Sequence, residues 1–306
     1  MVNIFGNEAV RGKKGDRGPS GPRGLPGKQG EKGDSGSIED SCTWMGNTVL
    51  KNLELYDDKG CFFIDDPATD VEQSKEGEIT TWVSRTFEKN NLEAERTAKH
   101  LTKKLPNNRY GIVFDGKSRY YSEKLGLLQV SGGNCIGFLC ITFRTMSDAK
   151  DQVLVSNFQY SDMPYREISL SGIEKKIFIT SYNQEGKPKH ISIDHDANQW
   201  TTLYIEYNGY TSKPSDYTYI IKGADSTISS GHFTLDSDDY AAFGLAVGSR
   251  FSNDGFFTGE ISSLEIYHVS NTLKKFPKCL QNLVIDNHIM KDKEDNPPSS
   301  KKSRVK

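Results

Sequence analysis

Glycine occupies every third position from residue 12 to residue 36, without exception. Three chains wound together as polyproline II helices leave room for only a hydrogen atom at their shared axis, so this period requires three copies. A flexible Gly/Pro-rich linker has no reason to keep a strict three-residue period. The segment therefore predicts a triple helix in a homotrimer, with these trimerising residues: Gly12, Gly15, Gly18, Gly21, Gly24, Gly27, Gly30, Gly33 and Gly36.

This segment resembles a short collagen stalk. At a rise of about 3.1 Å per residue, its 25 residues would span roughly 75 Å. Pro26 is the one proline in the third position of a triplet, where hydroxylation would add stability. So short a stalk needs a neighbouring globular part to help it trimerise.

Charge separates the stalk from the rest of the chain. The whole chain has a formal net charge of −2, yet residues 11–36 carry seven Lys/Arg against three Asp/Glu. No aromatic residues alternate with these basic ones, which argues against a nucleic-acid partner and leaves a solvated shaft or contact with anionic polysaccharide. No apolar run approaches the length of a transmembrane segment. Although no signal peptide is visible, a collagen stalk indicates an extracellular protein, secreted or surface-associated.

The cysteines are too few for a disulfide-framed module, and none forms the C-x-x-C pair of a zinc site. They are Cys42, Cys61, Cys135, Cys140 and Cys279. Cys42, just past the stalk, could link chains of the trimer, and Cys279 could fasten the end of the domain. Cys135 or Cys140, inside an apolar strand, could instead be a buried small hydrophobe.

From Tyr110 onward the hydrophobic period is two, and turn dipeptides such as Asn208-Gly209 separate the apolar runs. The candidate strands are 111–115, 135–144, 152–158, 167–170, 176–180, 190–193, 200–207, 218–221, 245–248 and 261–267. They predict an all-β protein with stacked antiparallel sheets. In one strand Leu139, Ile141 and Phe143 should face the core, with Phe138, Cys140 and Thr142 on the other face.

Other stretches are less regular. Residues 90–105 have a helical composition without an apolar stripe, so a helix and a surface excursion are both open. A hydrophobic patch at 276–285 would close the domain, and the charged end that follows is expected to be disordered. The expected organisation is an N-terminal segment (1–11), the stalk (12–36), a linker and domain entry (37–79), a sandwich (80–285) and a charged tail (286–306).

A series of short motifs carries a family resemblance: Thr81-Trp82-Val83-Ser84-Arg85, the run 111–116, the run 199–209, Val247-Gly248-Ser249-Arg250 and the run 257–267. In this order they resemble the laminin G-like, concanavalin A-like group of lectin sandwiches. The resemblance implies an antiparallel jelly-roll sandwich of the kind found in extracellular binding proteins. It does not assign ligand-binding residues.

An enzyme of this fold would need paired carboxylates. Related glucanases take them from Glu-x-Asp-x-Glu on one strand, and this chain has no such run. Glu260 and Glu265, five positions apart, should face opposite sides of their strand. None of the six histidines lies in a Gly-x-Ser-x-Gly elbow, and scattered surface histidines are expected. We therefore expect no enzymatic activity and disfavour a glucanase-like hydrolase.

Calcium is the one cofactor considered. Asp236, Asp238 and Asp239 offer hard oxygen ligands in a short loop, as do Asp194 and Asp196 around His195, although acidic surface turns explain both clusters. Near other loops, three tyrosines could stack on sugars or simply pack on the sandwich. They are Tyr210, Tyr217 and Tyr240.

These observations predict a trimeric extracellular binding protein that presents lectin-like heads on a collagen stalk. Its expected partner is a glycan or an extracellular-matrix protein, as in cell adhesion. The alternative is a structural matrix component whose heads only nucleate the collagen trimer.

Overall fold

A computed structural model describes residues 58–86, 90–125, 135–157, 166–182, 187–195, 198–208, 215–223, 227–235, 244–250, 252, 254–270 and 278–289. The chain divides into two units, Met1–Ser37 and Ile38–Lys306. The first unit, with all the stalk glycines, lies outside the described residues, so the triple helix and the trimer remain predictions. Within the described residues, no helix is long and apolar enough to cross a membrane.

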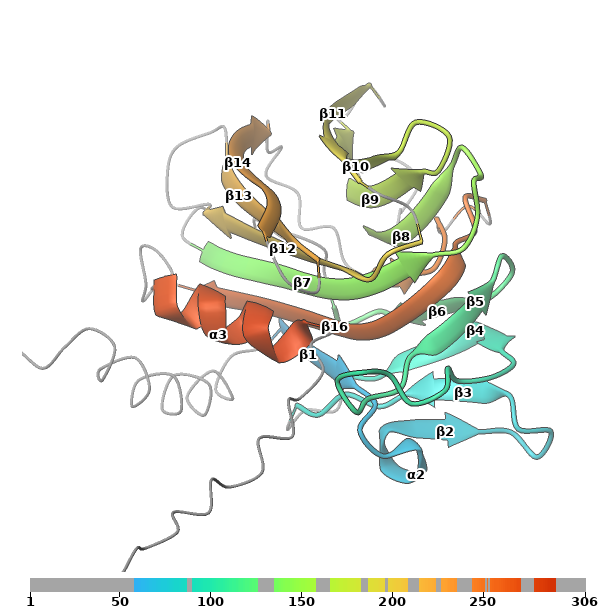
Figure 1. The fold of residues 1–306 in the computed structure, drawn as a ribbon. Coiled ribbons are helices and arrows are strands. Elements are labelled where there is room, and N and C mark those ends of the chain that lie inside the picture. Colours follow the sequence, from blue (N-terminus) through green and yellow to red (C-terminus); the bar gives the residue numbers. More distant parts are fainter. Residues whose placement is uncertain are drawn as a thin grey trace, which may run out of the picture. The chain divides into compact units, whose positions relative to one another are not determined.

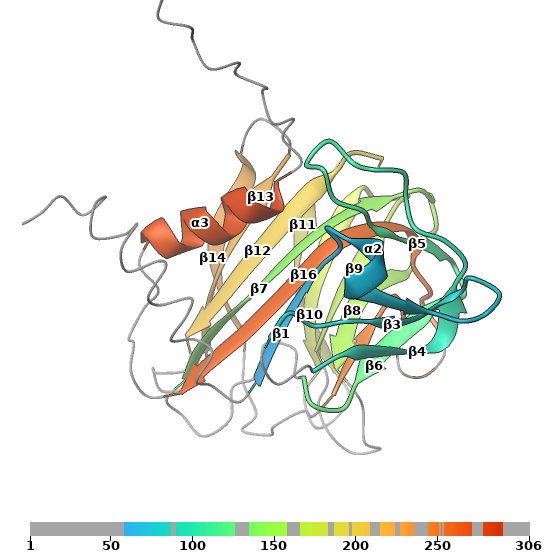
Figure 2. The same ribbon diagram turned by 90° about the horizontal axis from the view of Figure 1, so that it is seen from below.

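The described part is an antiparallel β-sandwich of the jelly-roll type, with two stacked sheets and few helices (Figures 1 and 2). The first sheet has the order β1 (Asp58–Phe63), β16 (Thr258–Ser270), β7 (Cys135–Thr145), β12 (Thr201–Asn208), β13 (Ser215–Lys222), β14 (Thr227–Leu235), and β5 (Ile112–Asp115) also pairs with β16. Its longest strands, β7 and β16, pair along almost their whole length. This seven-stranded sheet is one wall of the core.

The second sheet has nine strands. Its order is β11 (Pro188–Asp194), β10 (Lys176–Tyr182), β9 (Arg166–Ser171), β8 (Gln152–Asn157), β15 (Leu245–Val247), β6 (Arg119–Ser122), β4 (Leu92–Ala98), β3 (Ile79–Trp82), β2 (Val71–Gln73). A short helix, α2 (Pro67–Asp70), precedes β2; Asp66 caps it by accepting a hydrogen bond from the Ala68 N–H. Residues 58–79, placed before the sandwich by the sequence, therefore include strands of both sheets.

The core lies between the sheets and is built from alternate residues of each strand. On β7, Leu139, Ile141 and Phe143 are fully buried in it, as predicted. Aromatic side chains from both sheets interlock there: Phe62 of β1 lies 5.5 Å from Trp82 of β3 between ring centroids. Such pairs add to the free energy gained from burial.

All ten predicted strands are confirmed, with ends shifted by a few residues, and six strands were not predicted: β1, β2, β3, β4, β6 and β14. Neither prediction for residues 90–105 is correct where β4 runs, because this segment pairs with β3 and β6. Leu92 and Ala98 of β4 are fully buried, so packing against the sheet overrides a local helical composition.

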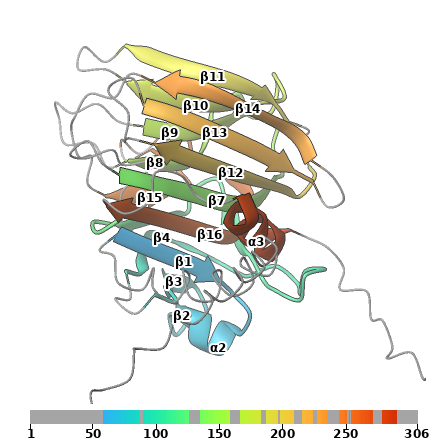
Figure 3. The ribbon, with the colours of Figure 1, turned by 90° about the vertical axis from the view of Figure 1, so that its left-hand side faces the viewer.

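The outer face of the seven-stranded sheet is covered by helix α3 (Lys278–His288), as Figure 3 shows. Phe138, Cys140 and Thr142, on this outer face of β7, are therefore as completely buried as the core residues. From residue 278 onward, the predicted closing patch is thus part of a helix. The helix continues past residue 285 to His288, and Ile289 beyond it is also buried, so the first residues assigned to the charged tail belong to the sandwich.

Candidate functional site

The outer face of the nine-stranded sheet is hollowed over β9, β10 and β11. This β9–β11 groove has a volume of about 490 Å³. It is lined by Lys150, Asp151, Ser169, Leu170, Ser171, Glu174, Phe178, Thr180, Tyr182, Pro188 and His190. A volume of this size is within the roughly 300–1,000 Å³ typical of small-molecule sites.

The alternation of β10 explains which side chains reach the groove. Ile177 and Ile179 point into the core, so Phe178, Thr180 and Tyr182 point outward. The register places Ser169 of β9 beside Phe178. On the other side, β11 places His190 beside Thr180.

The groove combines flat rings with hydroxyl groups. The rings of Phe178 and His190 meet edge to face, with centroids 5.5 Å apart. Thr180, Ser169 and Ser171 provide hydroxyls that can donate and accept hydrogen bonds. The groove thus offers apolar ring surface and polar groups side by side.

One wall of the groove is held by an ion-pair network around Arg250. Its guanidinium donates to Glu167 of β9 (2.6 Å) and to both carboxylate oxygens of Asp151 (2.6 and 2.8 Å). The hydrogen bond to Glu167, together with Asp151, raises the pKa of Arg250 further, although burial opposes this. Bidentate contacts of this kind fix geometry as well as charge, so Asp151 is anchored at the rim.

The prediction that Glu260 and Glu265 face opposite sides of their strand is wrong. A β-bulge at Ser262 adds one residue to β16, since Ile261 pairs with Phe143 and Ser263 pairs with Thr142. Both glutamates therefore lie on the outer face, but they have different partners. Glu260 accepts from Arg144 (Nε to Oε2, 2.8 Å), and Glu265 contacts His288.

The expectation of surface histidines is also wrong for His288, which is completely buried, and for His195, which is 5% exposed. His288 lies between two partners: Nδ1 is 2.8 Å from Ser263 Oγ, and Nε2 is 2.9 Å from Glu265 Oε2. These three groups have the connectivity of a nucleophile, base and carboxylate. Ser263 is also fully buried, so the arrangement gives no access to a substrate and instead fastens helix α3 to the sheet.

Most of the predicted calcium ligands and sugar-stacking tyrosines lie outside the described residues. Asp196, Asp236, Asp238 and Asp239 lie outside the described residues, as do Tyr210 and Tyr240. Within the described part of the chain, no group of three or more His, Cys, Asp or Glu side chains is arranged for a metal ion. Tyr217 packs in the core, stacked on Phe233 at 4.9 Å, as the packing interpretation predicted.

Two cysteine side chains are described, Cys61 and Cys140, and neither forms a disulfide. Burial, with the nearby Glu265 carboxylate, raises the pKa of both thiols. Cys140 is a buried small side chain, as proposed from the sequence. Cys42 lies outside the described residues, as do the side chains of Cys135 and Cys279, so the link between chains remains a prediction.

Sequence reasoning did not find the groove. A signal was present, because the segment 176–182 places Phe178 and Tyr182 on the solvent-facing side of its alternation. The groove also needs Lys150 and Asp151 from the loop between β7 and β8, and only the folded sheet brings these close to β10.

No known family model matches this chain, and no curated protein matches it either. Among solved structures, a botulinum neurotoxin type G receptor-binding domain matches with a TM-score of 0.43 and 10% identity, over 69% of this chain and 49% of that chain. An arabinofuranosidase complexed with arabinofuranosyl-alpha-1,2-xylobiose matches with a TM-score of 0.48 and 10% identity, over 70% and 51%.

Domain 4 of AbnA, a GH43 extracellular arabinanase from Geobacillus stearothermophilus in complex with arabinotriose, matches with a TM-score of 0.40 and 16% identity, over 73% of this chain and 96% of that domain. The chain spans about half the length of the neurotoxin and arabinofuranosidase structures. At these scores the likeness carries no functional argument.

Proposed function

We propose that this protein is a non-enzymatic glycan-binding protein that holds a carbohydrate in the β9–β11 groove. The observation that carries the proposal is the combination, in one groove of about 490 Å³, of Phe178, Tyr182 and His190 with the hydroxyls of Ser169, Ser171 and Thr180. This pairing of surfaces matches the two-sided chemistry of a sugar.

A pyranose ring has apolar C–H faces and a polar edge of hydroxyl groups. The C–H faces pack on an aromatic ring, while each hydroxyl needs a partner that donates or accepts a hydrogen bond. Phe178 offers the ring, with Thr180 and Ser169 beside it on the same sheet surface. Leaving ligand hydroxyls unpaired would be costly, so these neighbours would select for sugars over purely apolar ligands.

Binding without catalysis is favoured by the carboxylates of the groove. Glycoside hydrolysis requires two carboxyl groups that flank the scissile bond, one of them able to give up a proton. The lining has two acidic side chains, Asp151 and Glu174. Both oxygens of Asp151 accept hydrogen bonds from Arg250, so among the described lining residues Glu174 is the one carboxylate outside the Arg250 network.

The glycine period supports the rest of the proposal. Three heads on one collagen-like stalk would bind a dense glycan surface with an avidity about 10²–10⁴ higher than one head. The protein would act outside the cell, where glycans of matrix and surfaces are displayed. A matrix component whose heads only nucleate the triple helix would have no use for the groove.

The test is binding of the full-length protein to an array of neutral oligosaccharides, with the Phe178→Ala and Thr180→Ala variants. We expect each to weaken binding by about tenfold, the loss of one ring or hydrogen-bond contact of about 1–1.5 kcal/mol. Leu283→Ala is the control, because Leu283 is a 43% exposed apolar side chain on helix α3, over the other sheet.

Binding that is unchanged in both groove variants would refute the assignment of the site. Absence of glycan binding, together with intact assembly, would favour the structural alternative. Release of reducing sugar that depends on Glu174 would overturn the non-enzymatic part of the proposal.

A further inference from the structure

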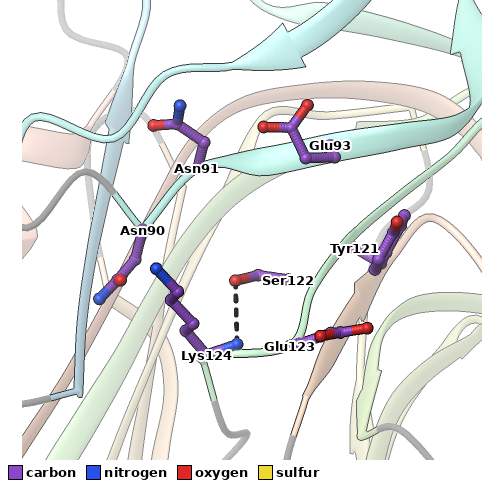
Figure 4. Close-up of a pocket in the computed structure, with 7 residues that line it drawn as sticks. All are labelled: Asn90, Asn91, Glu93, Tyr121, Ser122, Glu123 and Lys124. Atoms are coloured by element: carbon purple, nitrogen blue, oxygen red, sulfur yellow. Dashed lines mark hydrogen bonds between the residues drawn. The ribbon is translucent and has the colours of Figure 1, made fainter.

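A second hollow lies in the same sheet, where β4 begins and β6 ends (Figure 4). Asn90, Asn91 and Glu93 form its β4 side, and Tyr121, Ser122, Glu123 and Lys124 form its β6 side. Its volume is about 320 Å³, near the lower end of the usual range for small-molecule sites and enough for one ring-sized unit. We call it the β4–β6 hollow.

This hollow is separate from the β9–β11 groove. Both lie along one cross-strand row, in which Tyr121 pairs with Ala246, Ala246 with Ser156, and Ser156 with Glu167. The three residues that follow Tyr121 in this row are at most 2% exposed. At a strand spacing of about 4.8 Å, β6 and β10 are about 19 Å apart, so the two hollows would bind ligand groups independently.

The polar groups of the β4–β6 hollow are held in place. The Ser84 N–H donates to Asn91 Oδ1 at 3.0 Å, which directs the other end of this amide, its NH₂ group, to act as donor. The Thr81 hydroxyl lies 3.0 Å from Glu93 Oε2 and 3.1 Å from Glu72 Oε2, so these two carboxylates share its one proton as acceptors. Ser122 Oγ accepts from the Lys124 N–H at 3.3 Å, which leaves its hydroxyl proton to be donated.

Charge selects the ligand class. Among its described residues, the lining carries two carboxylates, Glu93 and Glu123, against one ammonium group, Lys124. This balance favours a ligand with a positive charge. The amide of Asn91 and the hydroxyl of Ser122 are suited to ligand hydroxyl groups, and the ring of Tyr121 offers an apolar face.

We propose that the β4–β6 hollow binds a hydroxylated ammonium ligand, and that its ligand class is an amino sugar with a free amine. The amine would lie against Glu93, while the hydroxyls would bond to Asn91 and Ser122. This second site goes beyond the proposed function and does not depend on it, because it uses different residues and recognises charge.

The test compares two ligands that differ only in acetylation of the amines. The full-length protein is titrated by calorimetry with a hexamer of β-1,4-linked glucosamine, at mildly acidic pH where the amines are protonated, and with the same hexamer fully N-acetylated. We expect the free-amine hexamer to bind at least tenfold more tightly. This preference should shrink as salt is added, since the contact is partly exposed.

Three variants locate the site. Glu93→Gln removes the charge but keeps an acceptor for Thr81, and it should weaken binding about tenfold, because a hydrogen bond to a charged group contributes about 1.5 kcal/mol or more. Glu72→Gln is the matched control: Glu72 Oε2 also lies 3.1 Å from the Thr81 hydroxyl, but Glu72 does not line the hollow. Lys124→Gln should tighten binding, because it removes a positive charge from the lining.

Equal effects of Glu93→Gln and Glu72→Gln would mean that the hexamer responds only to general acidity, and would overturn the proposal. So would equal binding of the acetylated hexamer. Loss of hexamer binding in Phe178→Ala, but not in Glu93→Gln, would place the ligand in the β9–β11 groove and refute the second site while the proposed function stands. Binding that depends on Glu93 without any neutral glycan binding would support the second site and refute the proposed function.

Discussion

Replacing His288 by Phe should be among the most destabilising single changes on helix α3. Phe keeps a ring against Phe63, whose centroid lies 4.8 Å from that of His288, but it removes both imidazole contacts. Glu265, 5% exposed, then loses its Nε2 partner, and the buried Ser263 hydroxyl loses Nδ1. The cost arises in the folded state, because both groups would be hydrated in the unfolded chain.

The magnitude follows from the burial of these groups. Leaving a buried donor or acceptor without its partner typically costs about 1–3 kcal/mol, and more when the group is charged. Two buried groups lose a partner here, and Tyr267, which also hydrogen-bonds to Glu265, provides partial compensation, so we expect about 3 kcal/mol. Leu283→Ala, on the exposed side of the same helix, should cost less than about 1 kcal/mol.

The assay is urea unfolding followed by tryptophan fluorescence, with the double variant Glu265→Leu/His288→Phe as the decisive comparison. Removing both partners of a buried pair leaves no uncompensated charge, so the double variant should recover part of the loss. A loss below about 1 kcal/mol for His288→Phe would refute this reasoning. So would a double variant that loses the sum of the two single changes.

Three further predictions concern other parts of the chain. Burial opposes the charged form of Asp65, but hydrogen bonds from Arg85 and Arg109 outweigh it and lower the pKa of this carboxyl group. The contribution of Asp65 to stability is therefore present above about pH 4, the unfolded pKa, and is lost as pH falls through the lower folded pKa. Unfolding measured across an acid titration should show wild type more stable than Asp65→Asn by less than about 1 kcal/mol at neutral pH, and this difference should vanish in acid. Cys140, buried with a raised thiol pKa, should resist iodoacetamide until the protein unfolds, and mass spectrometry that finds it labelled in native protein would contradict its burial. Gly24→Arg should disrupt the triple helix and abolish trimers in sedimentation. Binding to a dense glycan layer should then fall by about 10²-fold or more, while binding of one soluble ligand is unchanged. An equal loss of binding in both formats would argue against avidity.

The strands that the sequence predicted and those it missed differ in a physical way. Strands such as β7 and β12 are long and carry runs of β-branched and aromatic residues, so their own pattern identifies them. β2, β3 and β6 have three or four residues each and mix polar with apolar side chains, so neither a period nor an apolar run is visible in them, whereas the equally short β5 and β15 are apolar runs bounded by turn residues. β4 has a polar, helix-like composition, and it is a strand because β3 and β6 pair with both of its edges.

The candidate sites were less predictable than the strands. The face on which Glu265 lies depends on a β-bulge at Ser262. Side-chain alternation along the sequence assumes an uninterrupted strand, so it assigns every residue after the bulge to the wrong face. The outer face of β7 is buried because helix α3, more than 130 residues later in the chain, packs on it, together with Tyr204 and Tyr267 of the neighbouring strands. The sequence of β7 alone cannot distinguish two buried faces from one.

Local patterns were enough to predict the all-β class and ten strands, because side-chain alternation and turn chemistry act between neighbours in the chain. Glycine periodicity is also a local pattern, and the triple-helical stalk that it predicts lies outside the described residues. The β9–β11 groove, the β4–β6 hollow and the His288 contacts depend on cross-strand register and on loops that meet far from each other in sequence. Register is set by the packing of the whole sandwich. For this reason the functional proposals became specific only when the folded sheets placed Phe178 beside His190 and Glu93 beside Tyr121.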